Sequence, residues 1–124
     1  MAFRKRRTKV IKMRMIAAVI VVLILWVTVS KGEGHDLILA AYYGDLSEVK
    51  RLLDTGAEVN AKTKDGQTAL IYASIKGDLK VVEMLLAKGA EGNTKDNNGK
   101  TALILATRMN HPEVRELLIR AGAK

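Results

Sequence analysis

Apolar residues follow two different patterns along this chain, and the change between them falls near residue 30. Met15 to Val29 is an unbroken run of uncharged, mostly apolar residues. Further on, apolar residues recur every three or four positions between polar ones, as at Leu79, Val82, Leu85 and Leu86. The first pattern predicts a helix that is apolar on every side, and the second predicts helices that bury one face.

The second pattern repeats every 33 residues. A shift of 33 places aligns leucines, alanines and Gly-Ala pairs in three successive segments: Leu37, Leu70 and Leu103; Leu52, Leu85 and Leu118; Ala40, Ala73 and Ala106; and the pairs beginning at Gly56, Gly89 and Gly122. A period of this length indicates stacked units, each too small to bury its own apolar face.

Each unit is predicted to consist of two short helices and a loop. In the middle unit Asp65-Gly66 is a tight-turn signal, and Thr68 is suited to cap a helix over about 69–75. Gly77 ends that helix, and a second helix over about 79–87 ends at Gly89. The third unit repeats this order with Asn98-Gly99 at the turn, Thr101 at the cap, Asn110 at the helix end and Pro112 in the first turn of the second helix.

The motifs within the repeat are similar to those of ankyrin repeats. Residues 65–70 and 98–103 resemble the family's D-G-x-T-P-L opening, while Gly77-Asp78-Leu79 and Gly89-Ala90-Glu91 resemble its two glycine turns. The resemblance covers about residues 36–124, and it implies an all-α solenoid of about three helix-turn-helix units with β-hairpin loops. The repeats are expected at about 36–62, 63–95 and 96–124, and the first resembles an N-terminal capping repeat.

The sequence departs from the family's pattern at several positions. The family's proline is replaced by alanine at Ala69 and Ala102, and its histidine by isoleucine at Ile71 and Ile104. Its valine is replaced by glycine at Gly92. The resemblance therefore implies weaker helix starts and a less tightly packed second loop. The sequence also ends soon after the third Gly-Ala pair, so we expect partial exposure, through fraying or as a contact between copies, of Val114, Leu117, Leu118 and Ile119.

The net charge of +8 is concentrated at the N-terminus. Residues 1–30 hold seven Lys or Arg and no acidic residue, whereas residues 31–124 hold fourteen basic and thirteen acidic residues. A near-neutral domain lacks the patch that neutralises phosphates, so no nucleic acid is expected as a partner. The absence of cysteine excludes disulfides, thiolate metal sites and cysteine nucleophiles.

Residues 1–30 are predicted to be a basic head and a hydrophobic signal or anchor segment, followed by a linker at 31–35. As a helix, residues 15–29 would be about 22 Å long, short of a hydrocarbon core of about 30 Å. Only a loose signal-peptidase site follows, which favours a retained anchor over a cleaved signal peptide. Either way, the basic head stays cytoplasmic, so the repeat domain is expected on the periplasmic or extracellular side, membrane-anchored or secreted.

No residue pattern is typical of catalysis. The two histidines, His35 and His111, lie in different repeats and lack neighbours at metal-ligand spacing. Nucleotide-binding and hydrolase motifs are absent, and the aspartates lie mostly at expected helix starts and turns. We therefore expect no enzyme activity, no catalytic or metal site, no cofactor and no small-molecule substrate. The resemblance implies a structural role for His111, in the family's Gly-His turn.

The resemblance implies that a protein partner would contact two parts of the array. One part is the loop tips, called the fingers here; the other is the inner face of each first helix, called the palm. Carried over by position, the finger residues are Lys62, Lys64, Asp65, Gln67, Lys95, Asn97, Asn98 and Lys100, and the palm residues are Tyr42, Tyr43, Ile75, Lys76, Arg108 and Met109.

Each of these residue types has two interpretations. Exposed tyrosines are good interface anchors, but one of Tyr42 and Tyr43 would also fit beneath the first helix pair. Ile75 would equally suit packing between repeats. Lysines at loop tips suit an acidic partner, and they also serve solubility.

Three functions are compatible with the sequence. The first is a non-enzymatic protein-protein interaction module that is exported or anchored in a membrane through residues 15–29. The second is a structural component that self-assembles through its uncapped last repeat. The third is an accessory subunit of an envelope enzyme.

Overall fold

The computed structural model describes residues 17–24 and 34–124, and it divides the chain into two compact units, Met1–Ser30 and Lys31–Lys124. The predicted basic head, the two ends of the hydrophobic run and the start of the predicted linker lie outside the described residues. Residues 17–24 are helical, and all their side chains are exposed. Within the two described ranges, every helix is too short or too polar to span a bilayer.

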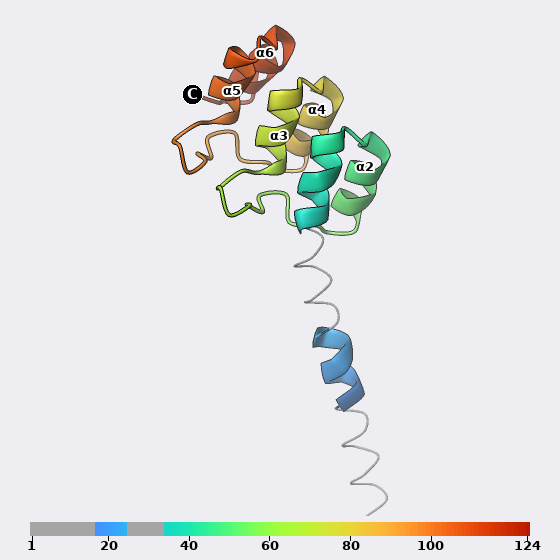
Figure 1. Ribbon diagram of the computed structural model, residues 1–124. Helices are drawn as coiled ribbons and strands as arrows, with labels where there is room; N and C mark the ends of the chain where they lie inside the picture. The colour runs from blue at the N-terminus through green and yellow to red at the C-terminus, as the bar shows by residue number, and fades with distance from the viewer. Residues whose placement is uncertain (1–16, 25–33) are drawn as a thin grey trace, which may run out of the picture. The chain divides into compact units, whose positions relative to one another are not determined.

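The second unit is built from stacked pairs of antiparallel helices. After a helical segment over residues 34–43, the helices in order are α2 (Leu46–Asp54), α3 (Ala69–Lys76), α4 (Leu79–Ala87), α5 (Ala102–Arg108) and α6 (Pro112–Arg120). α3 packs on α4 and α5 on α6 within pairs, while α3 contacts α5, and α4 contacts both α2 and α6, between pairs. Residues 34–43, α3 and α5 therefore form a layer of inner helices beside the outer helices α2, α4 and α6 (Figure 1).

Side chains at the loop ends explain where the helices begin. The Thr68 hydroxyl accepts a hydrogen bond from the Ile71 N–H at 3.3 Å, and Thr101 does the same for Ile104 at 3.3 Å. Each bond satisfies one of the amide groups that have no partner in a first helical turn. The predicted caps are thus confirmed, and α3 and α4 lie within one residue of their predicted bounds.

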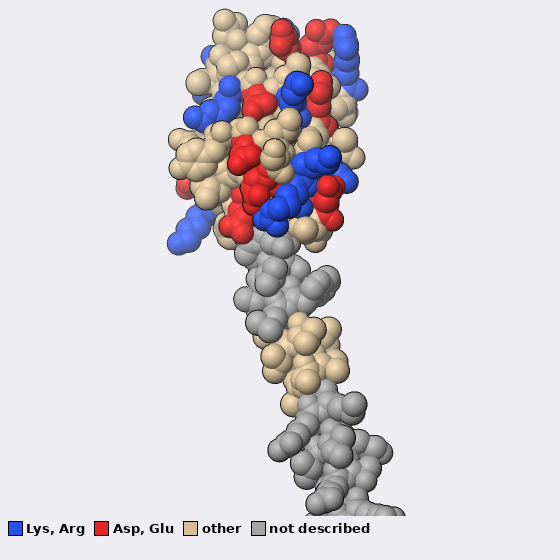
Figure 2. Space-filling model, turned by 90° about the vertical axis from the view of Figure 1, so that its right-hand side faces the viewer, with Lys and Arg blue, Asp and Glu red and all other residues tan. Residues whose placement is uncertain are grey.

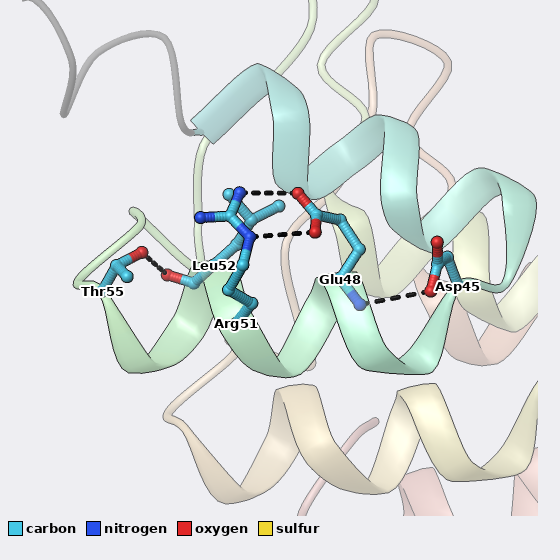
Figure 3. Close-up of polar contacts among 5 residues, drawn as sticks. All are labelled: Asp45, Glu48, Arg51, Leu52 and Thr55. Carbon is cyan, nitrogen blue, oxygen red and sulfur yellow. Dashed lines mark hydrogen bonds and ion pairs between the residues drawn. The ribbon is translucent and has the colours of Figure 1, made fainter.

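α2 is held by polar contacts along its exposed side (Figure 3). Asp45 accepts a hydrogen bond from the Glu48 N–H at 3.2 Å, and Thr55 donates to the Leu52 carbonyl at 2.9 Å. Between these ends, Arg51 donates twice to the Glu48 carboxylate. The hydrogen bond from Arg51, followed by its charge, holds the pKa of Glu48 below its ordinary value.

The core lies between the two layers and repeats with the sequence. Leu52, Leu85 and Leu118, from three successive outer helices, are each 0% exposed. The predicted buried face of α4 is partly wrong, because Val81 is fully buried whereas Leu79 and Leu86 are only partly buried. α4 packs against α2, α3 and α6, so its buried arc is wider than one helical stripe.

The two loops lack the strands expected of β-hairpins: within residues 34–124 no residue is in a strand. Each turn is closed by backbone hydrogen bonds within it: Thr63 N to Gln67 O and Gly66 N to Thr63 O, both at 2.9 Å, and Asp96 N to Lys100 O at 2.9 Å and Gly99 N to Asp96 O at 3.0 Å. Thr68 follows Gln67 directly and already caps α3. The chain therefore enters the helix before a second pair of residues can form the backbone hydrogen bonds of a β-ladder. Both loops leave the helical layers on the same side (Figure 1).

Two expectations about the ends of the domain are corrected. Gly34 and His35 are helical, and a Cβ on Gly34 would lie 2.8 Å from that of Ala61, so this glycine packs in the domain instead of forming a linker. In α6, Val114 and Leu118 are buried against the preceding pair and Leu117 is partly buried. The expected partial exposure holds for Leu117 and for Ile119, which is 49% exposed, and is wrong for Val114 and Leu118.

Candidate functional site

A cluster of three tyrosines lies where the first two inner helices meet. Tyr42 and Tyr43, at the end of the 34–43 helix, are 41% and 73% exposed. The Tyr42 ring meets that of Tyr43 edge-on at 5.2 Å between centroids, and that of Tyr72 on α3 edge-on at 5.7 Å. Lys76 Nζ stands 4.4 Å from the Tyr42 ring centroid, within the range of a cation–π contact.

Tyr43 lines two open hollows. One, of about 610 Å³, is lined by Tyr42, Tyr43, Gly44, Lys76, Gly77, Asp78, Leu79 and Lys80. The other, of about 530 Å³, is lined by Asp36, Leu39, Ala40, Tyr43, Asp45 and Glu48. Tyr43 thus borders both hollows. The alternative in which one tyrosine packs beneath the first helix pair is therefore wrong, since both rings are exposed.

The remaining palm residues come from the ends of α3 and α5. Lys76 and Arg108 are exposed, and Met109 is 52% exposed. Ile75 is only partly exposed and packs against the core, as the packing alternative predicts.

The finger residues differ in how freely they are presented. The side chains of Lys62, Lys64, Asp65, Lys95, Asn97 and Asn98 are exposed, whereas those of Gln67 and Lys100 are half-buried. Asn97 joins the two fingers, because its Nδ2 donates to the Lys64 carbonyl at 2.9 Å and its backbone N–H donates to that of Asp65 at 2.9 Å. Its donors thus hold one finger against the other, which the sequence analysis did not foresee.

Sequence reasoning missed two residues of the palm. Tyr72 completes the aromatic cluster, and Leu39, its counterpart 33 residues earlier, is 55% exposed beside Tyr43. The repeat contains the signal that would have found them, because Leu39, Tyr72 and Leu105 align at the period. Leu39 and Tyr72 were left out because the contact positions were taken from the family pattern, which does not include this position.

His111 is held in a packing and hydrogen-bonding position between repeats. His111 Nε2 lies 2.9 Å from the Ile75 carbonyl, and a Cβ on Gly77 would lie 2.4 Å from the His111 ring. The imidazole therefore fills the space above a glycine and ties α6 to the preceding pair. Across the described ranges, no three His, Asp or Glu side chains gather to hold a metal ion.

Helix pairs stacked at a 33-residue period, with turns extending from one side, define a repeat solenoid. The chain matches the family model for ankyrin repeats (3 copies) over residues 37–124, and it belongs to the ankyrin-repeat family. A search of curated proteins finds no match to the sequence. Ankyrin repeats are in general protein-protein interaction modules, and their fold is a non-enzymatic one.

Proposed function

We propose that this protein binds a protein partner through the palm and fingers, on the far side of a membrane to which residues 15–29 deliver or anchor it. The observation that carries the proposal is Tyr43, a large aromatic side chain that is 73% exposed and lines two hollows. A tyrosine offers a wide contact area at low conformational cost, and such residues dominate the binding energy of interfaces.

The surroundings of Tyr43 support its role as an anchor. Its ring is held edge-on against Tyr42, which Tyr72 and Lys76 contact in turn. Less side-chain entropy is therefore lost on binding than for a freely rotating ring. Leu39, on the same helix as Tyr43, and Met109, just after α5, add exposed apolar area.

Tyr43→Ala should weaken partner binding about tenfold or more while leaving the fold intact. The ring contributes little to the core because most of it faces solvent. Proximity labelling from a biotin ligase fused after Lys124 of the full-length chain would identify partners, and titration of the purified partner would measure affinity. Ile119→Ala is the matched control, because Ile119 is 49% exposed on α6, away from the palm. Equal partner binding by both variants, with unchanged thermal unfolding, would refute the proposal.

Delivery across a membrane rests on the hydrophobic run and the basic residues before it. A phosphatase that is active only after export, fused after Lys124, should be active, whereas a fused fluorescent protein that folds only in the cytoplasm should be dark. Replacing Leu23 and Leu25 by arginine should reverse both signals, since each charge costs about 3 kcal/mol in an inserting helix. A fluorescent, phosphatase-inactive wild-type fusion would exclude export.

Self-assembly is a second candidate function, favoured by one observation. Ile104 on α5 is 39% exposed, although its counterpart Ile71 on α3 is 1% exposed beneath the following helix pair. A second copy would cover Ile104 in the same way. Sedimentation of the full-length protein in detergent, compared with an Ile104→Asp variant, separates the candidates. A wild-type monomer at high concentration would count against assembly.

A further inference from the structure

We propose that the partner segment bound by the palm and fingers is an acidic, extended peptide with apolar side chains between its carboxylates. This inference rests on the proposed function and specifies its partner. It is carried by five basic residues, called the basic surface here: Lys64, Lys76, Lys95, Lys100 and Arg108.

The basic surface is not neutralised by its own chain. None of its five side chains forms an ion pair with a described carboxylate, whereas the ion pairs among described residues, Arg51–Glu48, Lys88–Asp54 and Arg120–Glu116, lie on the outer helices or at their ends. The face over the outer helices accordingly shows acidic and basic side chains interleaved (Figure 2). The five cations of the basic surface thus lie in the fingers or at the ends of α3 and α5, away from the three ion pairs.

The acidic groups of the palm lie in the two hollows beside Tyr43, with Asp78 in the hollow of Lys76 and Asp36, Asp45 and Glu48 in the other, and the finger tips hold few. Asp65 is the one exposed carboxylate of the two finger tips. Asp96 is 8% exposed, and its Oδ1 accepts hydrogen bonds from the N–H groups of Asn98 and Lys100 within its own turn. Lys62 is left out of the basic surface because it shares a hollow with the exposed Glu91, whereas Asp78, in the hollow of Lys76, is half-buried and accepts a hydrogen bond from the Val81 N–H. An incoming carboxylate would therefore meet a net positive field.

The spacing of the basic surface indicates the form of the ligand. Lys64, Lys95 and Lys100 lie in the fingers, before α3 and α5 begin, whereas Lys76 and Arg108 are the last residues of those helices. An eight-residue helix is about 12 Å long, a distance that an extended peptide spans in roughly four residues. Tyr72, Ile75 and Leu105 lie between the two ends and are partly exposed. Carboxylates about four residues apart, with apolar side chains between them, match this arrangement.

A random-peptide display selection on the immobilised full-length protein in detergent tests the inference. The selected peptides should be enriched in Asp and Glu relative to the starting library, and the affinity of a synthesised hit should fall when salt is raised. Replacing its acidic residues by Gln and Asn should weaken binding at least about fivefold. Selection of neutral or basic peptides would overturn the inference and leave the proposed function standing. Selection of none would count against both.

A matched pair of charge variants locates the contact. Lys64→Glu combined with Lys95→Glu should weaken binding of the acidic peptide at least about tenfold, because like charges then face each other. Lys50→Glu combined with Arg115→Glu makes the same change in net charge on the outer helices and should alter affinity less than about twofold. Equal losses of affinity in the two variants would overturn the assignment of the peptide to the fingers. Duplex DNA and phosphatidylglycerol vesicles serve as alternative polyanions. If one of them bound more tightly than the peptide, and the finger variant lost that binding, the ligand would be that polyanion and not a peptide.

Discussion

Leu52, Leu85 and Leu118 occupy the same place in α2, α4 and α6, and water reaches none of them. Leu85 is the central one, in the helix that packs against α2, α3 and α6 together. A side chain with neighbours on every side makes its full set of dispersion contacts, and its removal leaves a cavity that the surrounding helices cannot close.

Leu85→Ala should therefore lower the free energy of unfolding by about 2 to 5 kcal/mol, a large share of the total for so small a domain. Urea unfolding of the full-length protein, followed by circular dichroism, measures this change. Leu86→Ala provides the comparison, since Leu86 lies on the same helix but is only partly buried. A loss below about 1 kcal/mol at Leu85 would contradict the packing described for α4.

At the scale of a helix, local signals determine where each element ends. Contacts from other repeats determine how much a substitution at that end destabilises the protein. Gly77 ends α3 with φ at 74°, and Gly89 follows α4 with φ at 90°. Both glycines adopt the left-handed region, which disfavours side chains. They differ in their surroundings, because the His111 ring lies over Gly77 whereas nothing lies within 4 Å of a Cβ on Gly89.

Gly77→Ala should therefore destabilise the protein more than Gly89→Ala. In the Gly89 variant, backbone strain alone should lower the free energy of unfolding by about 1 kcal/mol. The decrease should be larger in the Gly77 variant because the His111 ring must move. A double-mutant cycle with His111→Ala isolates the second effect in denaturant melts. If the two glycine variants were equally stable in the wild-type background, the ring contact would be unimportant.

At the scale of the whole domain, asparagines join neighbouring repeats near the turns after α4 and α6. Asn60 accepts a hydrogen bond from the Glu91 N–H at 2.8 Å and donates to the Gly89 carbonyl at 3.4 Å. Asn93 makes the equivalent pair with Lys124 N and Gly122 O, one repeat later. In a linear array such contacts transmit stability from each unit to the next.

Asn60→Ala should lower the free energy of unfolding by about 1 to 2 kcal/mol, since it removes two hydrogen bonds between the first and second repeats. Hydrogen exchange should report faster exchange in residues 34–54 than elsewhere, because the first repeat is coupled less strongly to the others. Lys50→Ala, on the exposed side of α2, serves as the control. Uniform loss of protection across all repeats would show that the array unfolds only as one unit.

Much of this architecture could be predicted from the sequence because its signals are local. Thr68 and Thr101 act on the amide groups of the next few residues, whereas Pro112 and Gly77 act on their own backbone angles, so each works without knowledge of the fold. The period then pairs equivalent positions, and the apolar spacing of the middle unit placed Leu85 in the core.

The errors lie where a side chain's surroundings come from another repeat. Val81 is buried because α4 has neighbours on three sides, and Val114 is buried because α6 packs on α4 and α5. Asn97 resembles a free loop-tip residue in the sequence, but its amide binds the backbone of the preceding finger. The candidate site was predicted as positions only, and the exposure of Tyr43 and its contact with Tyr42 required the packed helices.

By itself, then, the sequence determined the repeat, the helix bounds and the family, because capping, turn formation and periodicity depend on residues near one another in the chain. Only the tertiary structure decided which lysines lack an ion pair, which tyrosines meet and which glycine lies beneath a histidine ring. These properties depend on groups about 33 residues apart in the chain, and stacking of the repeats brings such groups within a few ångströms of each other.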